Sequence, residues 1–396
     1  MTMRIFMTNL FLSRGSGSEA VTELLADALR RAGHEPILFA PEIGPQASRM
    51  RMRGHRVVDR LSGVVAPPDV IHAQHATPAL MAMAAFPGVP TVFASHSSIF
   101  EVEAPRPHPQ IRRVTAVDER GQERCIGCGF APGLVEIVPN AVDLDRFRPR
   151  QPLPAQPRRA LAIAKIPGHL PAIRAACAAK GIALDEVGPA TGRVSDRLED
   201  ELPNYDIVFA SGRSALEAAA VGCAVVLVDG TGMAGLLTTA NLGGLRAANF
   251  GVRILTAPVD PDSVGQAIAA YDPEDAALVT ARIRANASAD AYAAAYLRLY
   301  EAAIADPPPA DPAAIAAATA RWLEDLLPTS ADRPWRSVAA EIGGFVAERD
   351  AAALSAVLAR IEELPSLRAF RAASRVYRRV VPLGIRMKLR RLRGLG

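Results

Sequence analysis

Short apolar runs alternate with amphipathic stretches along most of the chain. The runs with the length of buried strands are 3–9, 36–40, 69–73, 90–95, 111–117, 134–138, 160–164, 182–187, 207–210 and 224–228. The stretches with helical spacing are 20–32, 78–85, 170–180, 215–220, 261–271 and 274–303. Strands that alternate with helices predict parallel sheets covered by helices on both faces. We therefore expect an α/β fold with doubly wound sheets.

A Pro- and Gln-rich segment, RQPLPAQP at 150–157, separates two such series and predicts a domain boundary. We expect two Rossmann-like domains at 1–150 and 151–290, a closing helix at 291–309 that returns to the first domain, and an α-helical extension at 310–396.

The stretch with the clearest candidate chemistry is 204–229, which predicts a strand, a tight turn, a helix and a second strand. The turn is Ser211-Gly212-Arg213-Ser214. Turns of this kind lie at the carboxyl edge of a parallel sheet, where free N–H groups and the helix dipole attract phosphate. Glu217 follows three residues later and could accept hydrogen bonds from a ribose diol. An ordinary N-cap with a first-turn glutamate fits the same residues.

Other candidates also follow predicted strands. A glycine-rich loop contains Gly15 and Gly17, and a later loop after 224–228 contains Thr231. His96 comes directly after the strand at 90–95, and Lys165 directly after the strand at 160–164. Residues at these ends face the crevice in which such folds hold ligands.

Composition and charge exclude several protein classes. No apolar run reaches 18 residues, and the N-terminal segment is too short for a signal peptide, so a cytoplasmic location is expected.

The net charge is +4, but residues 366–396 carry ten Arg and Lys and no acid, which leaves −6 for the rest. Arg interleaved with apolar residues there predicts a basic amphipathic helix and peripheral binding to an anionic membrane face. A solvated helix face is the alternative, and without stacking aromatics nucleic acid is not an expected partner. The four cysteines predict neither a disulfide framework nor a zinc site.

Several segments of the chain, in their order along the sequence, resemble the signatures of the retaining GT-B glycosyltransferases of family 4. The segment IVPNAVDLDRFRP (137–149) is similar to the family's interdomain signature, and SALEAAAVGCAVV (214–226) is similar to its donor-site signature. Residues 282–304 resemble the family's closing helix, and weaker matches are GSGSE (15–19) at its glycine-rich acceptor loop and VFASHSS (92–98) at its histidine. The resemblance covers about residues 3 to 305.

The resemblance implies an acceptor site on the N-terminal domain and a nucleotide-sugar site on the C-terminal domain, with no cofactor or metal. It implies that Glu217 grips the ribose, that Gly212 and Ser214 approach the diphosphate, and that His96 lies near the transferred sugar. It assigns Lys165 to the leaving diphosphate. The chain departs from the family at Phe209, where an acid is usual, and after Lys165, where a second lysine is missing; Arg213 could replace that cation.

The predicted activity is transfer of a sugar from a nucleotide-diphosphate sugar to a glycan or lipid-linked acceptor, with retention. The alternatives are a non-catalytic glycosyltransferase-like scaffold that binds a partner, and a sugar-nucleotide 2-epimerase. The segment at 139–147 speaks against the epimerase.

Overall fold

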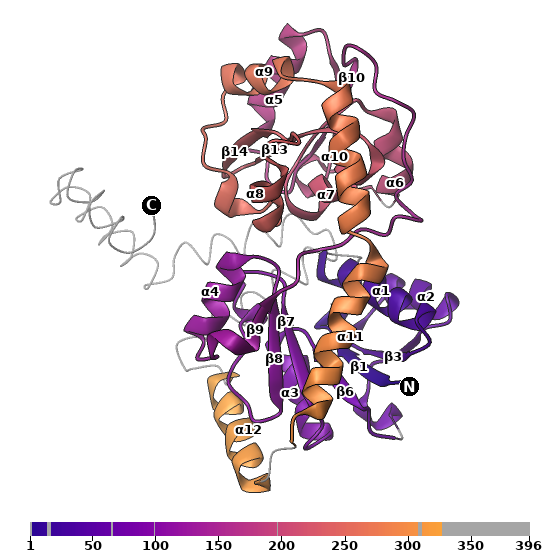
Figure 1. Ribbon diagram of the computed structural model, residues 1–396, viewed down its shortest axis with the longest axis vertical. Helices are drawn as coiled ribbons and strands as arrows, with labels where there is room; N and C mark the ends of the chain where they lie inside the picture. The colour runs from indigo at the N-terminus through magenta and orange to yellow at the C-terminus, as the bar shows by residue number, and fades with distance from the viewer. Residues whose placement is uncertain are drawn as a thin grey trace, which may run out of the picture. The chain divides into compact units, whose positions relative to one another are not determined.

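The computed structural model describes residues 2–326, except 14–16, 65, 99, 196 and 308–310. Met1–Trp322 form one compact unit that holds two large sheets (Figure 1). The predicted basic helix at 366–396 lies outside the described residues. Among the helices that the structure describes, none is long and apolar enough to cross a membrane.

The first sheet has seven parallel strands in the order β5-β3-β1-β6-β7-β8-β9. The strands are β1 (Arg4–Thr8), β3 (Glu35–Phe39), β5 (Arg56–Val58), β6 (Val70–Ala73), β7 (Thr91–Ser95), β8 (Ile111–Ala116) and β9 (Val135–Ile137). The helices that accompany them are α1 (Gly17–Arg31), α2 (Pro45–Met52), α3 (Ala76–Ala85) and α4 (Glu119–Gly127). A short pair, β2 (Phe11–Leu12) and β4 (Glu42–Ile43), lies apart from this sheet. The direction of the strand order reverses between β1 and β6, which is where doubly wound sheets hold ligands.

The second sheet has five strands in the order β11-β10-β12-β13-β14. The strands are β10 (Arg159–Ile163), β11 (Ala183–Val187), β12 (Ile207–Ala210), β13 (Ala224–Asp229) and β14 (Gly232–Leu236). The order reverses between β10 and β12, so the segments after Ile163 and Ala210 flank this switch point. The predicted α/β fold with two Rossmann-like domains is confirmed.

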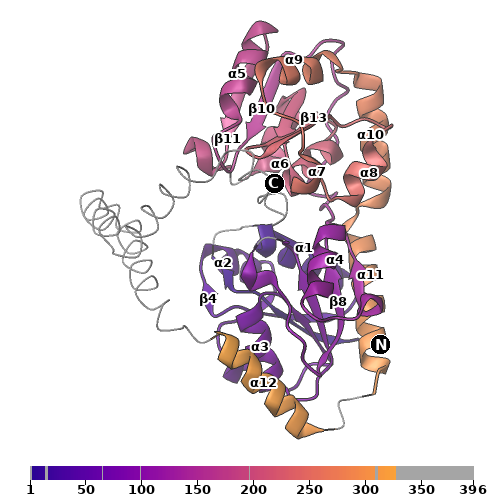
Figure 2. The ribbon, with the colours of Figure 1, turned by 90° about the vertical axis from the view of Figure 1, so that its left-hand side faces the viewer.

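Alternating side chains on the central strands fill two cores, because successive strand residues point to opposite faces. Phe209 and Val226 pack on one face with α5 (Leu170–Ala179) and α9 (Pro261–Ala269) (Figure 2). Val208 and Val225 pack on the other face with α7 (Gly212–Val221) and α10 (Pro273–Asn286). Both faces are covered, so these strands read as continuous apolar runs in the sequence.

Two predicted elements differ from the structure. The loop expected after 224–228 instead leads into β14 at Gly232, antiparallel to β13. The stretch expected as one helix at 274–303 is two, α10 and α11 (Ala289–Ala305), because Ser288 caps α11 by accepting a hydrogen bond from the N–H of Ala291 at 3.1 Å. The sequence patterns also missed α4 and α8 (Leu242–Ala247).

α11 packs against the first sheet, where buried hydrogen bonds hold it. The Tyr300 hydroxyl lies 2.8 Å from Nδ1 of His72, and the Tyr296 hydroxyl lies 3.0 Å from the hydroxyl of Thr115. Burial lowers the pKa of His72 to about 3, so its ring stays neutral at ordinary pH. Figure 1 shows α11 running alongside the strands of this sheet.

α12 (Pro312–Leu326) packs against the segment that leads into β8 of the first sheet, and its Trp322 is only 2% exposed. The ring of Trp322 lies edge-on to His108, and Nε2 of His108 lies 3.2 Å from the hydroxyl of Thr319. Burial lowers the pKa of His108 to about 4. The docked helix therefore favours the neutral histidine.

This gives a testable dependence of stability on pH. The unfolded chain binds a proton at His108 below about pH 6.5 while the folded chain does not, so stability is lost as pH falls from 6.5 toward 4. We expect His108→Gln to reduce the loss by up to about 1.4 kcal/mol per pH unit. Urea unfolding between pH 6.5 and 5 measures the slope. Thr319→Val removes the hydrogen bond but no proton, so it should keep the wild-type slope; equal slopes in His108→Gln and wild type would contradict the assignment.

Candidate functional site

The turn after β12 begins a helix earlier than the sequence predicts. α7 starts at Gly212 rather than near residue 215, with Ser211 as its extended N-cap residue. Gly212 has φ +58°, which a glycine adopts without strain, and its N–H donates to the carbonyl of Phe250 at 2.7 Å. One backbone N–H of the turn that is predicted to bind phosphate therefore already has a hydrogen-bond partner. Ser214 lies within the first turn of the helix.

The segment that supplies this carbonyl has an uncommon backbone. Asn249 and Phe250 both have φ +52°, a region that residues with a side chain seldom occupy. Such strain costs about 1–3 kcal/mol per residue and persists only where surrounding contacts hold it. The Asn249 side chain accepts a hydrogen bond from the N–H of Asn140 at 3.3 Å, which ties the segment to the interdomain signature.

Glu217 lies on α7 and lines a pocket between this helix, α1 and residues 141–147. The space it encloses, open mouth included, is about 410 Å³. Glu217 is 6% exposed, and its Oε1 lies 3.4 Å from Nε of Arg213. Burial raises the pKa of Glu217, and the charges of Arg213 and Arg146 oppose that rise. The carboxylate is thus held near two cations at the edge of an open space.

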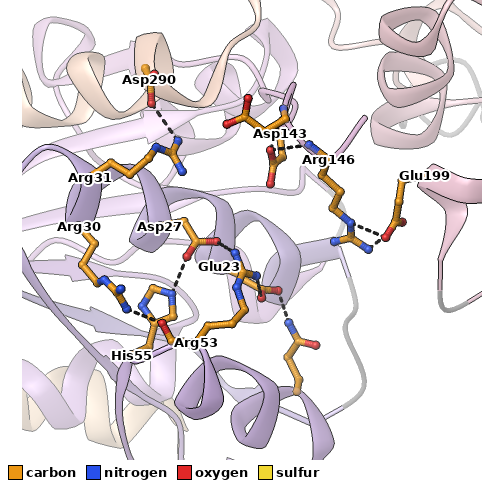
Figure 3. Close-up of polar contacts among 12 residues, drawn as sticks. Glu23, Asp27, Arg30, Arg31, Arg53, His55, Asp143, Arg146, Glu199 and Asp290 are labelled. Atoms are coloured by element: carbon orange, nitrogen blue, oxygen red, sulfur yellow. Dashed lines mark hydrogen bonds and ion pairs between the residues drawn. The ribbon is translucent and has the colours of Figure 1, made fainter. Parts of the chain in front are cut away.

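The opposite wall of the pocket is a charged network on α1 and the end of α2 (Figure 3). Arg53 forms ion pairs with Glu23 and Asp27, and Nε2 of His55 lies 2.7 Å from Asp27. Burial acts to raise the pKa of Asp27, but the hydrogen bond with His55 and the charge of Arg53 lower it overall. The Asp27 carboxyl group in this wall is therefore ionised.

Arg146 comes from the interdomain signature and also lines the pocket. Its guanidinium lies 2.9 Å from Glu199, and its backbone N–H donates to Asp143 at 3.1 Å (Figure 3). The three arginines that line the pocket, Arg53, Arg146 and Arg213, are all paired with carboxylates. An anion that entered would have to compete with these partners.

Lys165 lies just past β10, at the switch point of the second sheet, and its side chain is exposed. His169, four residues later, is 2% exposed and both of its ring nitrogens lack a hydrogen-bond partner. Burial lowers the pKa of His169, and the charge of Asp229 opposes this. The same Asp229 accepts hydrogen bonds from Ser211 at 3.3 Å and from the N–H of Thr231 at 2.7 Å. Ser211 and Thr231 are thus engaged with one carboxylate.

His96 lies at the carboxyl end of β7, as the sequence predicts. Its backbone N–H donates to Oε2 of Glu103 at 3.1 Å, while neither ring nitrogen has a partner. Burial lowers the pKa of His96, and Glu103 opposes this. The sequence analysis did not select Glu103, which follows in a short 3₁₀ turn and reaches His96 only through the fold.

Of the predicted site residues, the pocket brings together Arg213 and Glu217. Gly17 begins α1, and Gly15 lies outside the described residues. Across the described part of the chain, no three His, Cys, Asp or Glu side chains are placed to share a metal ion. Independence from metal stays a prediction.

Comparison with known proteins agrees with this architecture. Residues 15–146 match the family described as Glycosyltransferase Family 4, so the resemblance found in the sequence is confirmed. A search of curated proteins gives no match.

Solved structures with similar folds are glycosyltransferases at low sequence identity. A glycosyltransferase from Rickettsia africae is 13% identical with a TM-score of 0.56, covering 77% of this chain and 100% of that chain. HepE from Anabaena, solved with UDP and glucose, is 15% identical with a TM-score of 0.56, covering 76% and 99%. The catalytic domain of starch synthase IV from Arabidopsis thaliana, bound to ADP and acarbose, is 11% identical with a TM-score of 0.50, covering 77% and 100%. These likenesses establish the GT-B fold.

Proposed function

Because residues 15–146 match Glycosyltransferase Family 4 and both sheets form the GT-B fold, we propose that this chain transfers a sugar from a nucleotide-diphosphate sugar to a glycan or lipid-linked acceptor. We further propose that the configuration at the sugar is retained and that no metal is needed. HepE, with the same fold, was solved with UDP and glucose, which supports a nucleotide sugar as the class of donor.

The observation that carries the proposal is the placement of Glu217. Burial of a carboxylate costs free energy, and Glu217 is 94% buried. Its side chain borders an open pocket instead of the core, which indicates that the carboxylate is kept to bind a ligand. Its companions are Arg213 on the same helix and Arg146 on the interdomain signature. A ribose diol could donate to Glu217 while the attached diphosphate lies toward the start of α7.

In the proposed reaction, breakage of the bond between sugar and diphosphate leaves negative charge on the leaving group. Fixed cations and N–H groups lower the barrier most when they are positioned before the charge develops. Lys165 and Arg213 would supply this charge, and Ser214 would contribute from the first turn of α7. His96 would lie on the acceptor side, near the transferred sugar.

A non-catalytic scaffold is the second candidate, and two observations favour it. Phe209, at the position of the family's usual acid, is fully buried in the core. The N–H of Gly212 is bonded to the Phe250 carbonyl and is not free for phosphate. Both features weaken the usual contacts to sugar and diphosphate.

A thermal-shift panel tests the proposal directly. The full chain would be heated with UDP, GDP, ADP and TDP, and then with their sugar conjugates, in the presence of EDTA. One base should stabilise the protein, by about 2.7 kcal/mol when the ligand is present at 100 times its Kd. Slow hydrolysis of the matching sugar nucleotide would favour the enzyme, whereas the absence of any shift would favour the scaffold.

Association with a membrane is a separate part of the proposal. Residues 366–396, outside the described residues, carry ten basic side chains. Sedimentation with anionic liposomes, using the full chain and a chain that ends at residue 365, tests this. Equal sedimentation of both would contradict a membrane role for the tail.

A further inference from the structure

A buried cluster of titratable side chains lies at the carboxyl edge of the first sheet. β6 and β7 are parallel neighbours, so the segments after Ala73 and Ser95 leave the sheet side by side. The first carries His75 and the second carries His96, and the chain after β7 turns back to add Glu103. This edge adjoins the switch point between β1 and β6.

The hydrogen bonds fix the state of His75. Its Nδ1 accepts from the N–H of Leu10 at 3.1 Å, so a neutral ring carries its proton on Nε2. That nitrogen lies 3.3 Å from Oε1 of Glu103 and donates to it. His75 also has φ +60°, a strained conformation for a residue with a side chain. Its backbone is therefore held in an unfavourable state in which the ring meets both partners.

Glu103 is held from three sides. Oε1 accepts from His75, Oε2 accepts from the backbone N–H of His96 at 3.1 Å, and its own carbonyl accepts from the hydroxyl of Ser95 at 2.8 Å. The residue is 5% exposed. Burial acts to raise the pKa of Glu103, but the His75 hydrogen bond and the nearby imidazoles lower it overall, so the buried carboxyl group is ionised.

The ring of His96 is the incomplete part of this cluster. All seven histidines lie among the described residues, and only His96 and His169 have two buried ring nitrogens without a partner. Buried polar atoms are seldom left unpaired, and a natural exception calls for an explanation. At a ligand crevice, the explanation that fits is a polar group brought by the ligand.

We propose that Glu103 and His75 are positioning residues, which hold His96 so that its bare ring nitrogens receive a sugar hydroxyl at the edge of the first sheet. Glu103 fixes the backbone at His96 and places a negative charge beside its imidazole, and His75 fixes Glu103. The inference rests on the proposed function, since it takes the sugar of the nucleotide-sugar site as the ligand. No residue of the Glu217 pocket takes part in it.

The coupling is measured by NMR titration of the full chain labelled with ¹³C at histidine Cε1. The groups that face His96 are Glu103, His75 and His72. Glu103→Gln keeps the shape but removes the charge, so the titration midpoint of His96 should fall by about one pH unit. His75→Asn keeps the charge of Glu103 but removes the imidazole that fixes it, so the His96 midpoint should fall by a smaller amount. The midpoint of His108, which contacts Thr319 and Trp322 and not this cluster, is the internal control.

The outcomes separate a positioning role from a structural one. A fall in both variants, larger in Glu103→Gln, with the His108 midpoint constant, supports the proposal. An unmoved His96 midpoint in either variant would overturn it. If Glu103→Gln does not fold, His75→Asn still decides, because its His96 midpoint falls only if His75 holds Glu103 in place.

A second titration tests the ligand. UDP-glucose and GDP-mannose, each compared with its free diphosphate, would be added to the labelled wild type. The His96 signal should respond to a sugar nucleotide but not to the matching diphosphate, and the response should shrink in Glu103→Gln. A nucleotide that binds without moving the His96 signal would overturn this inference alone. No response of any kind to either nucleotide would contradict the proposed function, and with it the ligand named here.

Discussion

Replacement of Glu217 by glutamine should weaken binding of the preferred nucleoside diphosphate about 10- to 100-fold. Glutamine keeps the length and shape of the side chain but removes the charge that a ribose diol would meet. Hydrogen bonds to a charged group contribute roughly 1.5–3 kcal/mol, which corresponds to this range of affinity. Burial at 6% exposure keeps solvent from replacing the lost interaction.

Calorimetry on the full chain measures the effect. Glu35→Gln is the matched control, because Glu35 is an exposed carboxylate at the start of β3 whose ion-pair partner is Arg4. The control should bind as wild type does. Since burial raises the pKa of Glu217, wild-type binding should also weaken on acidification at a higher pH than an ordinary carboxylate would give. Equal affinity in wild type and Glu217→Gln would remove Glu217 from the nucleotide site.

The central strands of both sheets could be predicted because they are buried on two faces. Such strands are continuous apolar runs, and β12 matches its predicted limits, 207–210. β14 has the sequence GMAGL, with two glycines and weak alternation, and its pairing with β13 is a tertiary contact. A local pattern does not contain that information.

The residues of the candidate site also fall into two groups, those that local spacing predicts and those that only tertiary contacts bring together. Arg213 and Glu217 were found because one helical turn places them together, so local spacing is sufficient. Glu103 lies seven residues from His96 and 28 from His75, and only the parallel pairing of β6 with β7 brings the three together. The carbonyl of Phe250 reaches Gly212 from 38 residues away. Contacts of this kind require the sheet order, which the sequence alone left open.

Replacement of Gly188 by alanine should have the largest effect on stability of the changes considered. Gly188 follows β11 with φ +120°, and an added Cβ would lie 2.3 Å from the carbonyl oxygen of Ala164. All three of its nearest atoms belong to the backbone of Ala164, so no side-chain rotation relieves the contact. We expect a loss of about 4 kcal/mol or more, the range reserved for severe core disruption.

Gly181→Ala is the matched control for this change. Gly181 has φ +66°, but an added Cβ there meets nothing within 4 Å, so only the backbone cost of about 1–2 kcal/mol applies. Thermal unfolding followed by circular dichroism compares the two variants. Because Ala164 directly precedes Lys165, any relaxation that accommodates the new Cβ must displace the strand end that carries this lysine. Gly188→Ala should therefore lose activity beyond its loss of folded protein, whereas equal melting temperatures for the two variants would contradict the close approach at Ala164.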